Sequence, residues 1–500
     1  MFKNKILGLS KYSAAAGTLA LCGCTMIPDY ENPDETYGRG KLDAPEFKHA
    51  AGLWKNAAPS DGAPKGEWWA IFGDAKLDAL IKACDANNPD IAAAFQRVER
   101  AREAAFMGES DLYPHLSSAD YYKRDGRTEV QKPVATGTYS SWVVGLGATW
   151  DLDLFGRIQS LVIRDRALAE ATYADYRNVM LAMHTRVAAE YFGLRQCESE
   201  IALLRKTLEV RKTQSEFVAK RKMLKFASGV DLSRAKLQES EAASELKSLL
   251  RRRDASLNTL AILVGESPSK FDFKCEPLSE SLPQIPKIVP SQLLERRPDI
   301  AAAEREVFAA NAKIGSDTAA FFPTVSITGD VGFGANKIED LLGASSLAWG
   351  VSPQVYIPIF QAGKIYAQKQ TDLAAYRGTV ERYKSKVLSA IGEVETSLSN
   401  LSHMEGEYAE RVRTTDYAKQ VQNFTQREYE LGNQDYFAVS DAQRQALLHE
   451  REQIKLLGAR YRQCVAFIMS LGGGWTAADD TPPPPPKEMY EAAEATVERK

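Results

Sequence analysis

The sequence of 500 residues has no run of 18 or more apolar residues, which argues against a helix that spans a membrane. Histidine occurs only five times. No Ser/His/Asp set, phosphate-binding loop or metal motif is evident. These absences predict that the chain is not an enzyme and needs no cofactor or metal for catalysis.

Cysteine is also scarce. Besides Cys22 and Cys24, the chain has Cys84, Cys197, Cys275 and Cys464. No CxxC or Cys/His spacing indicates a metal site. We expect these four residues to be buried or free thiols. A disulfide, which the periplasm would permit, remains the alternative.

The composition is that of a folded protein. Charged residues make up 26% and hydrophobic residues 44%, which argues against a disordered chain and against a helical membrane bundle. The formal charge is −3, or −6 once the three lysines of the N-terminal leader are removed. Such a charge gives no reason to expect nucleic-acid binding.

The first residues have the features of a processed leader. Three lysines precede a weakly apolar stretch that ends at Leu21-Cys22-Gly23-Cys24. This tetrapeptide resembles a bacterial lipobox, in which Cys24 would be the lipidated first residue of the mature chain. A lipid chain would anchor the protein without spanning the membrane. The alternative is an ordinary signal peptide with a chance cysteine.

The sequence contains an internal repeat. Pro89-Asp90-Ile91-Ala92-Ala93-Ala94 returns 209 residues later at Pro298, and from Gly156 to Gly265 the two copies keep a constant offset of 207. No proline lies between Pro133 and Pro268, or between Pro358 and Pro482. A long stretch without insertions or prolines predicts continuous helix.

Apolar residues recur every seven positions in these stretches, at Val187, Leu194, Ile201 and Leu208, and at Val394, Leu401 and Tyr408. This spacing predicts helices that pack lengthwise on neighbours. A helix from Gly156 to about Lys225 would be about 100 Å long at about 1.5 Å per residue. An intracellular coiled coil is the alternative, but the leader and the strands described next argue against it.

Before each long helix, residues alternate with a period of two. Trp142, Val144, Leu146 and Trp150 share one face of a predicted strand, and glycines, Thr149 and carboxylates share the other. In the second copy, residues 325–333 and 347–359 alternate in the same way. In the first copy, the alternation of the earlier segment, residues 116–123, is less clear. Half-buried soluble strands also alternate. Length near ten residues, an apolar face with Trp and a polar face with Gly favour a membrane barrel.

Four strands cannot close a barrel, and an unclosed edge in lipid leaves backbone groups unpaired. The chain is therefore expected to oligomerise. Two copies would give eight strands with a filled interior, and three would give twelve strands, wide enough for a channel.

Several separated motifs resemble one family in order and spacing. They are the lipobox, Trp68-Trp69-Ala70-Ile71-Phe72-Gly73-Asp74, Asn88-Pro89-Asp90-Ile91, Asp153-Leu154-Phe155-Gly156-Arg157, and Arg296-Arg297-Pro298-Asp299-Ile300 with the following Ala301-Ala302-Ala303-Glu304. Over about residues 65–475 the chain resembles the TolC-like outer membrane factors, in their lipoprotein branch, the channels of tripartite efflux pumps.

The resemblance implies a mainly α-helical fold with a membrane β-barrel part. A homotrimer would place a twelve-stranded barrel in the outer membrane, and a coiled-coil helical tunnel would continue it across the periplasm. The implied partners are a periplasmic membrane-fusion adaptor and an inner-membrane transporter, often of the proton-driven resistance-nodulation-division class. No chemistry on the substrate is required.

The expected organisation follows from the repeat and the resemblance. It comprises a signal peptide (1–23), a lipid-anchored segment (24–64), a first repeat (65–264, with strands over 115–155 and a helix pair over 156–264), a linker (265–289), a second repeat (290–475, with strands over 324–360 and a helix pair over 361–472), and a proline-rich linker with a charged tail (476–500).

Each long helix must reverse direction at a tip. Gly432 is expected to take a left-handed conformation after one helix, and Asn433 or Asp435 to cap the next. In the first copy the break falls at Lys225–Leu232, where Lys225 stands in place of Gly432. The resemblance implies that the tips contact the adaptor. The expected contact residues are Ser228, Gly229, Gly432, Asn433, Asp435 and Tyr436.

The resemblance also implies a gate at the periplasmic mouth. Asp441 would face the axis, with Phe437 one helical turn earlier, and three copies of Asp441 would form a ring. Asp231 from the first copy would add three more carboxylates, and such rings select cations. Tyr429 matches a tyrosine that helps to hold the mouth shut, which suggests a hydrogen bond to Asp231. Solvated helix positions are the alternative for both aspartates.

The predicted function is a trimeric exit duct that conducts small molecules passively to the outside. The outer-membrane channel of a type I protein-secretion system is the alternative within the same fold. A periplasmic structural or adhesive coiled coil on a lipid anchor is an alternative from a different class, and it would form no pore.

Overall fold

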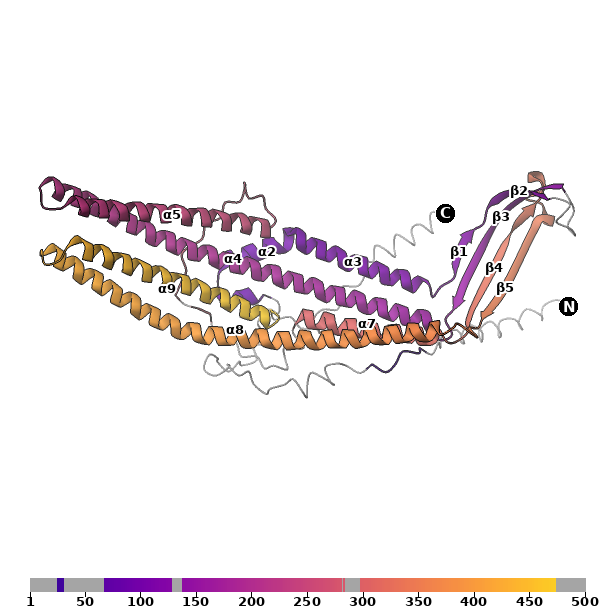
Figure 1. Ribbon diagram of the computed structural model, residues 1–500. Helices are drawn as coiled ribbons and strands as arrows, with labels where there is room; N and C mark the ends of the chain where they lie inside the picture. The colour runs from indigo at the N-terminus through magenta and orange to yellow at the C-terminus, as the bar shows by residue number, and fades with distance from the viewer. Residues whose placement is uncertain (1–24, 31–66, 128–136, 281, 284–296, 474–500) are drawn as a thin grey trace. The chain divides into compact units, whose positions relative to one another are not determined.

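The computed structural model describes residues 25–30, 67–127, 137–280, 282–283 and 297–473 (Figure 1). The leader, the candidate lipidation residue Cys24 and the proline-rich tail lie outside these residues. The chain divides into two compact units. The sheet unit contains Met1–Pro33, Arg97–Thr172 and Ala302–Tyr383, and the hairpin unit contains Asp34–Gln96, Tyr173–Ala301 and Lys384–Lys500.

The sheet unit is built on an antiparallel sheet of five strands (Figure 1). The strands are β1 (His115–Ser118), β2 (Tyr121–Arg127), β3 (Gly137–Leu152), β4 (Thr324–Ala335) and β5 (Leu347–Tyr356). The order is β1-β3-β4-β5, with β2 also paired to β3. Within the described residues, β5 and the β1/β2 row therefore form the two edges of this sheet.

The first predicted strand is interrupted rather than continuous. Between β1 and β2, the Ala119 amide donates to the Gly145 carbonyl at 2.9 Å, and the Gly145 amide donates to Asp120 Oδ1 at 3.1 Å. The Asp120 side chain thus takes the position of a backbone acceptor. β1 and β2 keep a single register against β3, since His115 faces Thr149 and Tyr121 faces Val143.

The strand register aligns the two predicted faces across the sheet. Leu146 pairs with Val331, and Val331 pairs with Trp349, so exposed apolar side chains line one face. Gly147 pairs with Asp330, which pairs with Gly350 on the other face. The alternation expected for β3, β4 and β5 is confirmed.

Two glycines permit a close approach between β3 and β4. Gly145 and Gly332 are register partners. A Cβ on Gly332 would lie 2.6 Å from Gly145 Cα, and a Cβ on Gly145 would lie 2.8 Å from the Val331 carbonyl oxygen. Any side chain at either position would push the strands apart.

The strands end earlier than the sequence pattern suggested. β5 ends at Tyr356, although the alternation continues to Ile359. Pro358 has no N–H to donate to a ladder, which explains the early end. β3 ends at Leu152, and the Leu154 amide turns back to the Leu152 carbonyl at 2.9 Å.

The helices of the two halves have matched bounds. They are α3 (Pro89–Ser110) and α7 (Pro298–Ala319), α4 (Arg157–Met223) and α8 (Lys364–Glu430), and α5 (Gly229–Leu263) and α9 (Tyr436–Ser470). Both ends of α8 and α9 lie 207 residues after the ends of α4 and α5. The first half also contains η2 (Trp68–Phe72) and α2 (Ala75–Asn87).

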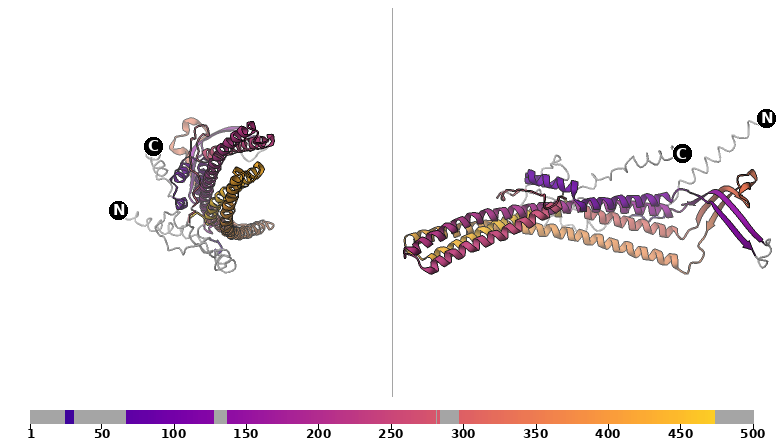
Figure 2. Two further views of the ribbon diagram at one scale, coloured as in Figure 1. Left: turned by 90° about the vertical axis from the view of Figure 1, so that its left-hand side faces the viewer. Right: turned by 90° about the horizontal axis from the view of Figure 1, so that it is seen from above.

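In the hairpin unit, α4 with α5 forms the first hairpin and α8 with α9 forms the second (Figures 1 and 2). The two hairpins contact each other through α5 and α9. Val187, Leu194 and Ile201 are buried on α4, as the seven-residue spacing predicts, and so is Val394 on α8.

The main core of the hairpin unit lies at the end opposite the tips. It gathers aromatic and aliphatic side chains from η2, α2, α4, α5 and α9, among them Trp68, Trp69, Leu77, Ile81, Tyr191, Phe192, Leu260 and Tyr461. Phe192 stacks on Tyr461 with ring centroids 4.8 Å apart. Among the described helices, none combines the length and apolarity that a transmembrane segment requires.

Candidate functional site

The two hairpin tips are closed by the same turn. At the first tip the Phe226 amide donates to the Arg221 carbonyl at 2.8 Å, and at the second the Asn433 amide donates to the Glu428 carbonyl at 2.9 Å. Lys225 has a φ of 63° and Gly432 a φ of 83°, so both occupy the left-handed region. This is the arrangement of a helix that ends in a Schellman motif. The expected conformation of Gly432 is confirmed.

The next helix at each tip starts with a side-chain cap. Ser228 caps α5 and Asp435 caps α9. The Asp435 carboxylate accepts from the Ala438 amide at 2.9 Å. Asn433 does not cap α9, because its side-chain amide donates to Glu428 at 2.9 Å. Of the two expected caps, Asp435 is therefore the one that the fold uses.

The suggested hydrogen bond between Tyr429 and Asp231 is not formed. Asp231 completes a capping box: its Oδ2 accepts from the Ser228 amide at 3.0 Å, while its own amide donates to Ser228 Oγ at 3.1 Å. The Tyr429 hydroxyl instead accepts from Arg221 Nη1 at 3.0 Å. The Arg221 guanidinium also lies 5.3 Å from the centre of the Tyr429 ring. Arg221 is the partner that the sequence reasoning missed.

Tyr436 lies in a small core that joins the two tips. It packs with Val218 and Ala235 of the first hairpin, and its ring makes an edge contact with Tyr429 at 5.8 Å. Only 5% of Tyr436 is exposed, and burial raises its pKa. Tyr436 was expected to contact the adaptor, but it is buried in this core and exposes almost no surface to a partner.

Phe437 and Asp441 lie one helical turn apart on α9. Phe437 is 53% exposed, and the Arg234 guanidinium lies 4.8 Å from its ring centre. Asp441 forms an ion pair with Arg444 at 2.7 Å. Asp441 thus has a neighbouring positive charge within the same chain, which the sequence pattern did not reveal.

Polar contacts between the hairpins continue away from the tips. Gln238 on α5 donates its side-chain amide to the Ser440 carbonyl of α9 at 2.9 Å, and within the first hairpin Arg211 on α4 donates to the backbone carbonyl of Gln238 at 2.8 Å. Further along, Arg451 on α9 pairs with Glu245 on α5 at 2.8 Å. Farther from the tips, apolar packing also joins the hairpins, because Leu447 of α9 lies in one buried cluster with Ile201 and Leu204 of α4.

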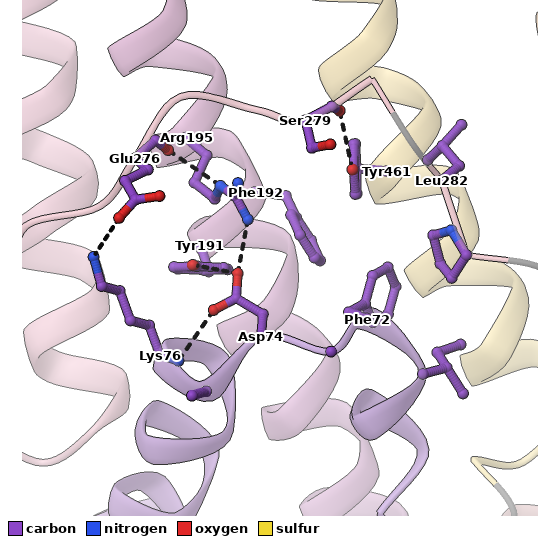
Figure 3. Close-up of a pocket in the computed structure, with 14 residues that line it drawn as sticks. Phe72, Asp74, Lys76, Tyr191, Phe192, Arg195, Glu276, Ser279, Leu282 and Tyr461 are labelled. Atoms are coloured by element: carbon purple, nitrogen blue, oxygen red, sulfur yellow. Dashed lines mark hydrogen bonds and ion pairs between the residues drawn. The ribbon is translucent and has the colours of Figure 1, made fainter.

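A pocket of about 530 Å³ lies in the hairpin unit beside the main core (Figure 3). Asp74, the cap of α2, accepts from the Tyr191 hydroxyl at 2.6 Å and from Arg195 at 2.7 Å. Arg195 also donates to the Glu276 and Pro277 carbonyls at 3.1 and 2.9 Å. These polar groups bond to one another. They fasten Glu276 and Pro277, in the segment that follows α5, to α4 through Arg195 and to the start of α2 through Asp74.

The described residues offer no evident metal site and no disulfide. No group of three or more His, Cys, Asp or Glu side chains in the described part of the chain is placed to hold a metal ion. Cys84, Cys197, Cys275 and Cys464 are free thiols, so the disulfide alternative is wrong for these four. Burial raises the pKa of the Cys84 thiol to about 12.

Comparison with known proteins places the chain in a family. The family model described as outer membrane efflux protein matches residues 80–266 and 289–473. The chain therefore belongs to the outer membrane efflux proteins, which confirms the resemblance read from the sequence motifs. It is an outer-membrane efflux channel and not an enzyme.

Relatives and solved structures agree with this assignment. The solvent efflux pump outer membrane protein SrpC of Pseudomonas putida is 29% identical over 468 residues, which cover 92% of this chain and 97% of the relative. The cation efflux system protein CusC of Escherichia coli K12 is 29% identical over 464 residues, covering 91% and 97%. The structure of the outer-membrane channel OprN has a TM-score of 0.81 at 26% identity, covering 90% of this chain and 100% of that one.

Proposed function

We propose that the chain forms a homotrimeric exit duct, with a twelve-stranded barrel in the outer membrane and a helical tunnel in the periplasm. The free edges of the described sheet support this proposal, because unpaired strand edges in lipid leave backbone groups without partners. The exposed apolar face of the sheet would contact lipid, and the face with Asp330 and the glycines would line the lumen. Cys24 would carry the lipid anchor.

The duct would serve a tripartite efflux system. Its partners would be a periplasmic membrane-fusion adaptor at the hairpin tips and an inner-membrane transporter, for which the resistance-nodulation-division class is the first expectation. The names of the relatives, a solvent efflux pump and a cation efflux system, support small molecules or ions as cargo over the protein cargo of a type I secretion channel. The duct would conduct passively.

The periplasmic mouth would open by moving the second hairpin away from the first. The single observation that carries this proposal is the small size of the apolar cluster at the tips, where three buried and three partly buried side chains and the Arg221–Tyr429 hydrogen bond join the hairpins. Packed elements with few contacts can shift between discrete arrangements. Phe437, Asp441 and Asp231 would face the mouth, and Ser228, Gly229, Gly432, Asn433 and Asp435 would form its outer rim.

The gate is tested by replacing Tyr429 with Phe and measuring conductance in planar bilayers. Losing the hydroxyl removes the Arg221 hydrogen bond and keeps the ring, so we expect a higher open fraction with an unchanged fold. Tyr417→Phe is the matched control, because Tyr417 lies on the same helix and is 65% exposed. Asp441→Ala should weaken cation preference in the same recordings. If Tyr429→Phe and Asp441→Ala both show the conductance and selectivity of the wild type, the proposed gate is wrong.

A further inference from the structure

The two hairpin tips carry opposite charge although they share one fold. Residues 220–236 of the first tip contain six Lys or Arg side chains and one Asp. The equivalent residues 427–443 of the second tip contain one Arg and four Asp or Glu. The net charges are therefore +5 and −3 over segments of equal length and matched secondary structure.

Four lysines of the first tip have no acidic partner in the part of the chain that the structure describes. Lys220, Lys222, Lys225 and Lys236 are exposed, and none of them takes part in an ion pair among the described residues. Exposed apolar side chains lie among them: Met223, Leu224, Phe226 and Val230 are 58–78% exposed. A basic rim around exposed apolar side chains is the composition of a binding surface.

Lys225 is held in a conformation that favours glycine. Its counterpart Gly432 has no Cβ and meets no steric penalty at φ 83°, whereas Lys225 adopts φ 63° with a full side chain. Glycine at position 225 would therefore adopt this turn with less steric strain than lysine. Lysine there places a charge at the apex of the first tip.

We infer that the first tip is the part of the mouth that binds an acidic partner protein, through carboxylates set beside apolar side chains. This inference rests on the proposed function and names the chemistry of the partner at that site. An anionic membrane would also attract lysines beside apolar residues. The second tip argues against a membrane. This tip is joined to the first through Tyr436 and carries a net charge of −3, so a uniform anionic surface would repel the second tip.

The experiment uses the purified full-length chain in detergent and two synthetic helical-hairpin peptides as probes. The peptides share the same apolar apex, and glutamates flank it in one and lysines in the other. By fluorescence anisotropy at low salt, we expect the glutamate peptide to bind at least about tenfold more tightly. The difference should shrink as the salt concentration rises, because screening weakens exposed charge pairs.

Variants assign the preference to the first tip. Lys222→Glu combined with Lys225→Glu should reverse the order of the two peptides, while Glu428→Lys combined with Glu430→Lys should leave glutamate-peptide binding undiminished. Lys225→Gly should weaken that binding about threefold or more without lowering thermal stability, because it removes the charge and relieves the backbone. Equal binding of both peptides to the wild-type chain would overturn the inference.

Two further measurements exclude other occupants. Mixed micelles of the same detergent with phosphatidylglycerol provide the anionic lipid surface. If they compete with the glutamate peptide as well as unlabelled peptide does, the tip binds a membrane and the inference is overturned. A peptide affinity that falls as the chain concentration rises would show that a second copy covers the tip, and it would overturn the inference as well. Planar-bilayer conductance of the same preparation tests the duct separately: a non-conducting wild type refutes the proposed function, whereas a conducting wild type without peptide preference refutes only the partner assignment.

Discussion

The two ends of the hairpin unit are stabilised in different ways. At the base, a large aromatic and aliphatic core draws on η2, α2, α4, α5 and α9, and the Asp74–Arg195 pair fastens the adjoining segment. At the tips, three buried side chains and a few polar contacts join the hairpins. The same pair of helix hairpins is thus firmly packed at one end and lightly packed at the other. On the proposed function, this difference would allow the mouth to open while the base of the hairpins stays packed.

The largest expected effect comes from a cavity at the base. Phe192→Ala removes a ring that is fully buried between Phe72 and Tyr461. We expect a loss of about 4 kcal/mol in the free energy of unfolding, from lost burial and the remaining cavity. Denaturant titration followed by circular dichroism measures it. Val218→Ala at the tips should cost only about 2 kcal/mol, because fewer buried atoms are removed. Equal losses would remove the contrast between the two ends.

A capping aspartate at each end gives a sharper comparison. Asp74→Ala leaves the partly buried Arg195 without its carboxylate and should cost about 3 kcal/mol. Asp435→Ala removes an exposed cap at the second tip and should cost about 1 kcal/mol. Both variants are measured by the same denaturant titration. If the tip variant were the more damaging, the tips would be the firmer end.

Gln238→Ala tests the polar contact between the hairpins. It removes the hydrogen bond to the Ser440 carbonyl, and we expect a loss of about 1 kcal/mol in stability. Because this bond joins the first hairpin to the second, the variant should also raise the open fraction in single-channel recordings. Thr259→Ala is the control, since its hydroxyl bonds only to the Ala255 carbonyl of its own helix. A stability loss without any change in gating would separate this contact from the gate.

The smallest expected effect is a pH dependence at the base. Burial alone would raise the pKa of Asp299, but the paired guanidinium of Arg297 outweighs it and lowers that pKa below the usual 3.8. A lowered pKa in the folded state means that this contribution is complete above the unfolded value and is lost as pH falls below about 4. Thermal melts between pH 5 and 3 should show a steeper decline for wild type than for Asp299→Asn. Parallel declines would contradict the prediction.

Much of the fold was predictable from the sequence, because the constant offset of 207 and the absence of proline constrain helix length strongly. The expected reversal at Gly432 and the faces of β3, β4 and β5 follow from local patterns in the same way. The side-chain partners did not follow. The family resemblance suggested Asp231 as the partner of Tyr429, but Asp231 forms the capping box with Ser228, and Tyr429 bonds to Arg221. Pairs such as Asp74 with Arg195, 121 residues apart, depend on packing that no local pattern reveals.

The two hairpins have equal lengths, helix by helix. α4 and α8 each have 67 residues, and α5 and α9 each have 35. Removing seven residues from one arm would withdraw its tip by about 10 Å and separate Tyr436 from Val218. To change the length of both hairpins and keep the tip contact, deletions or insertions must be equal in all four helices. The lengths of the two halves of the gene are therefore tied to each other.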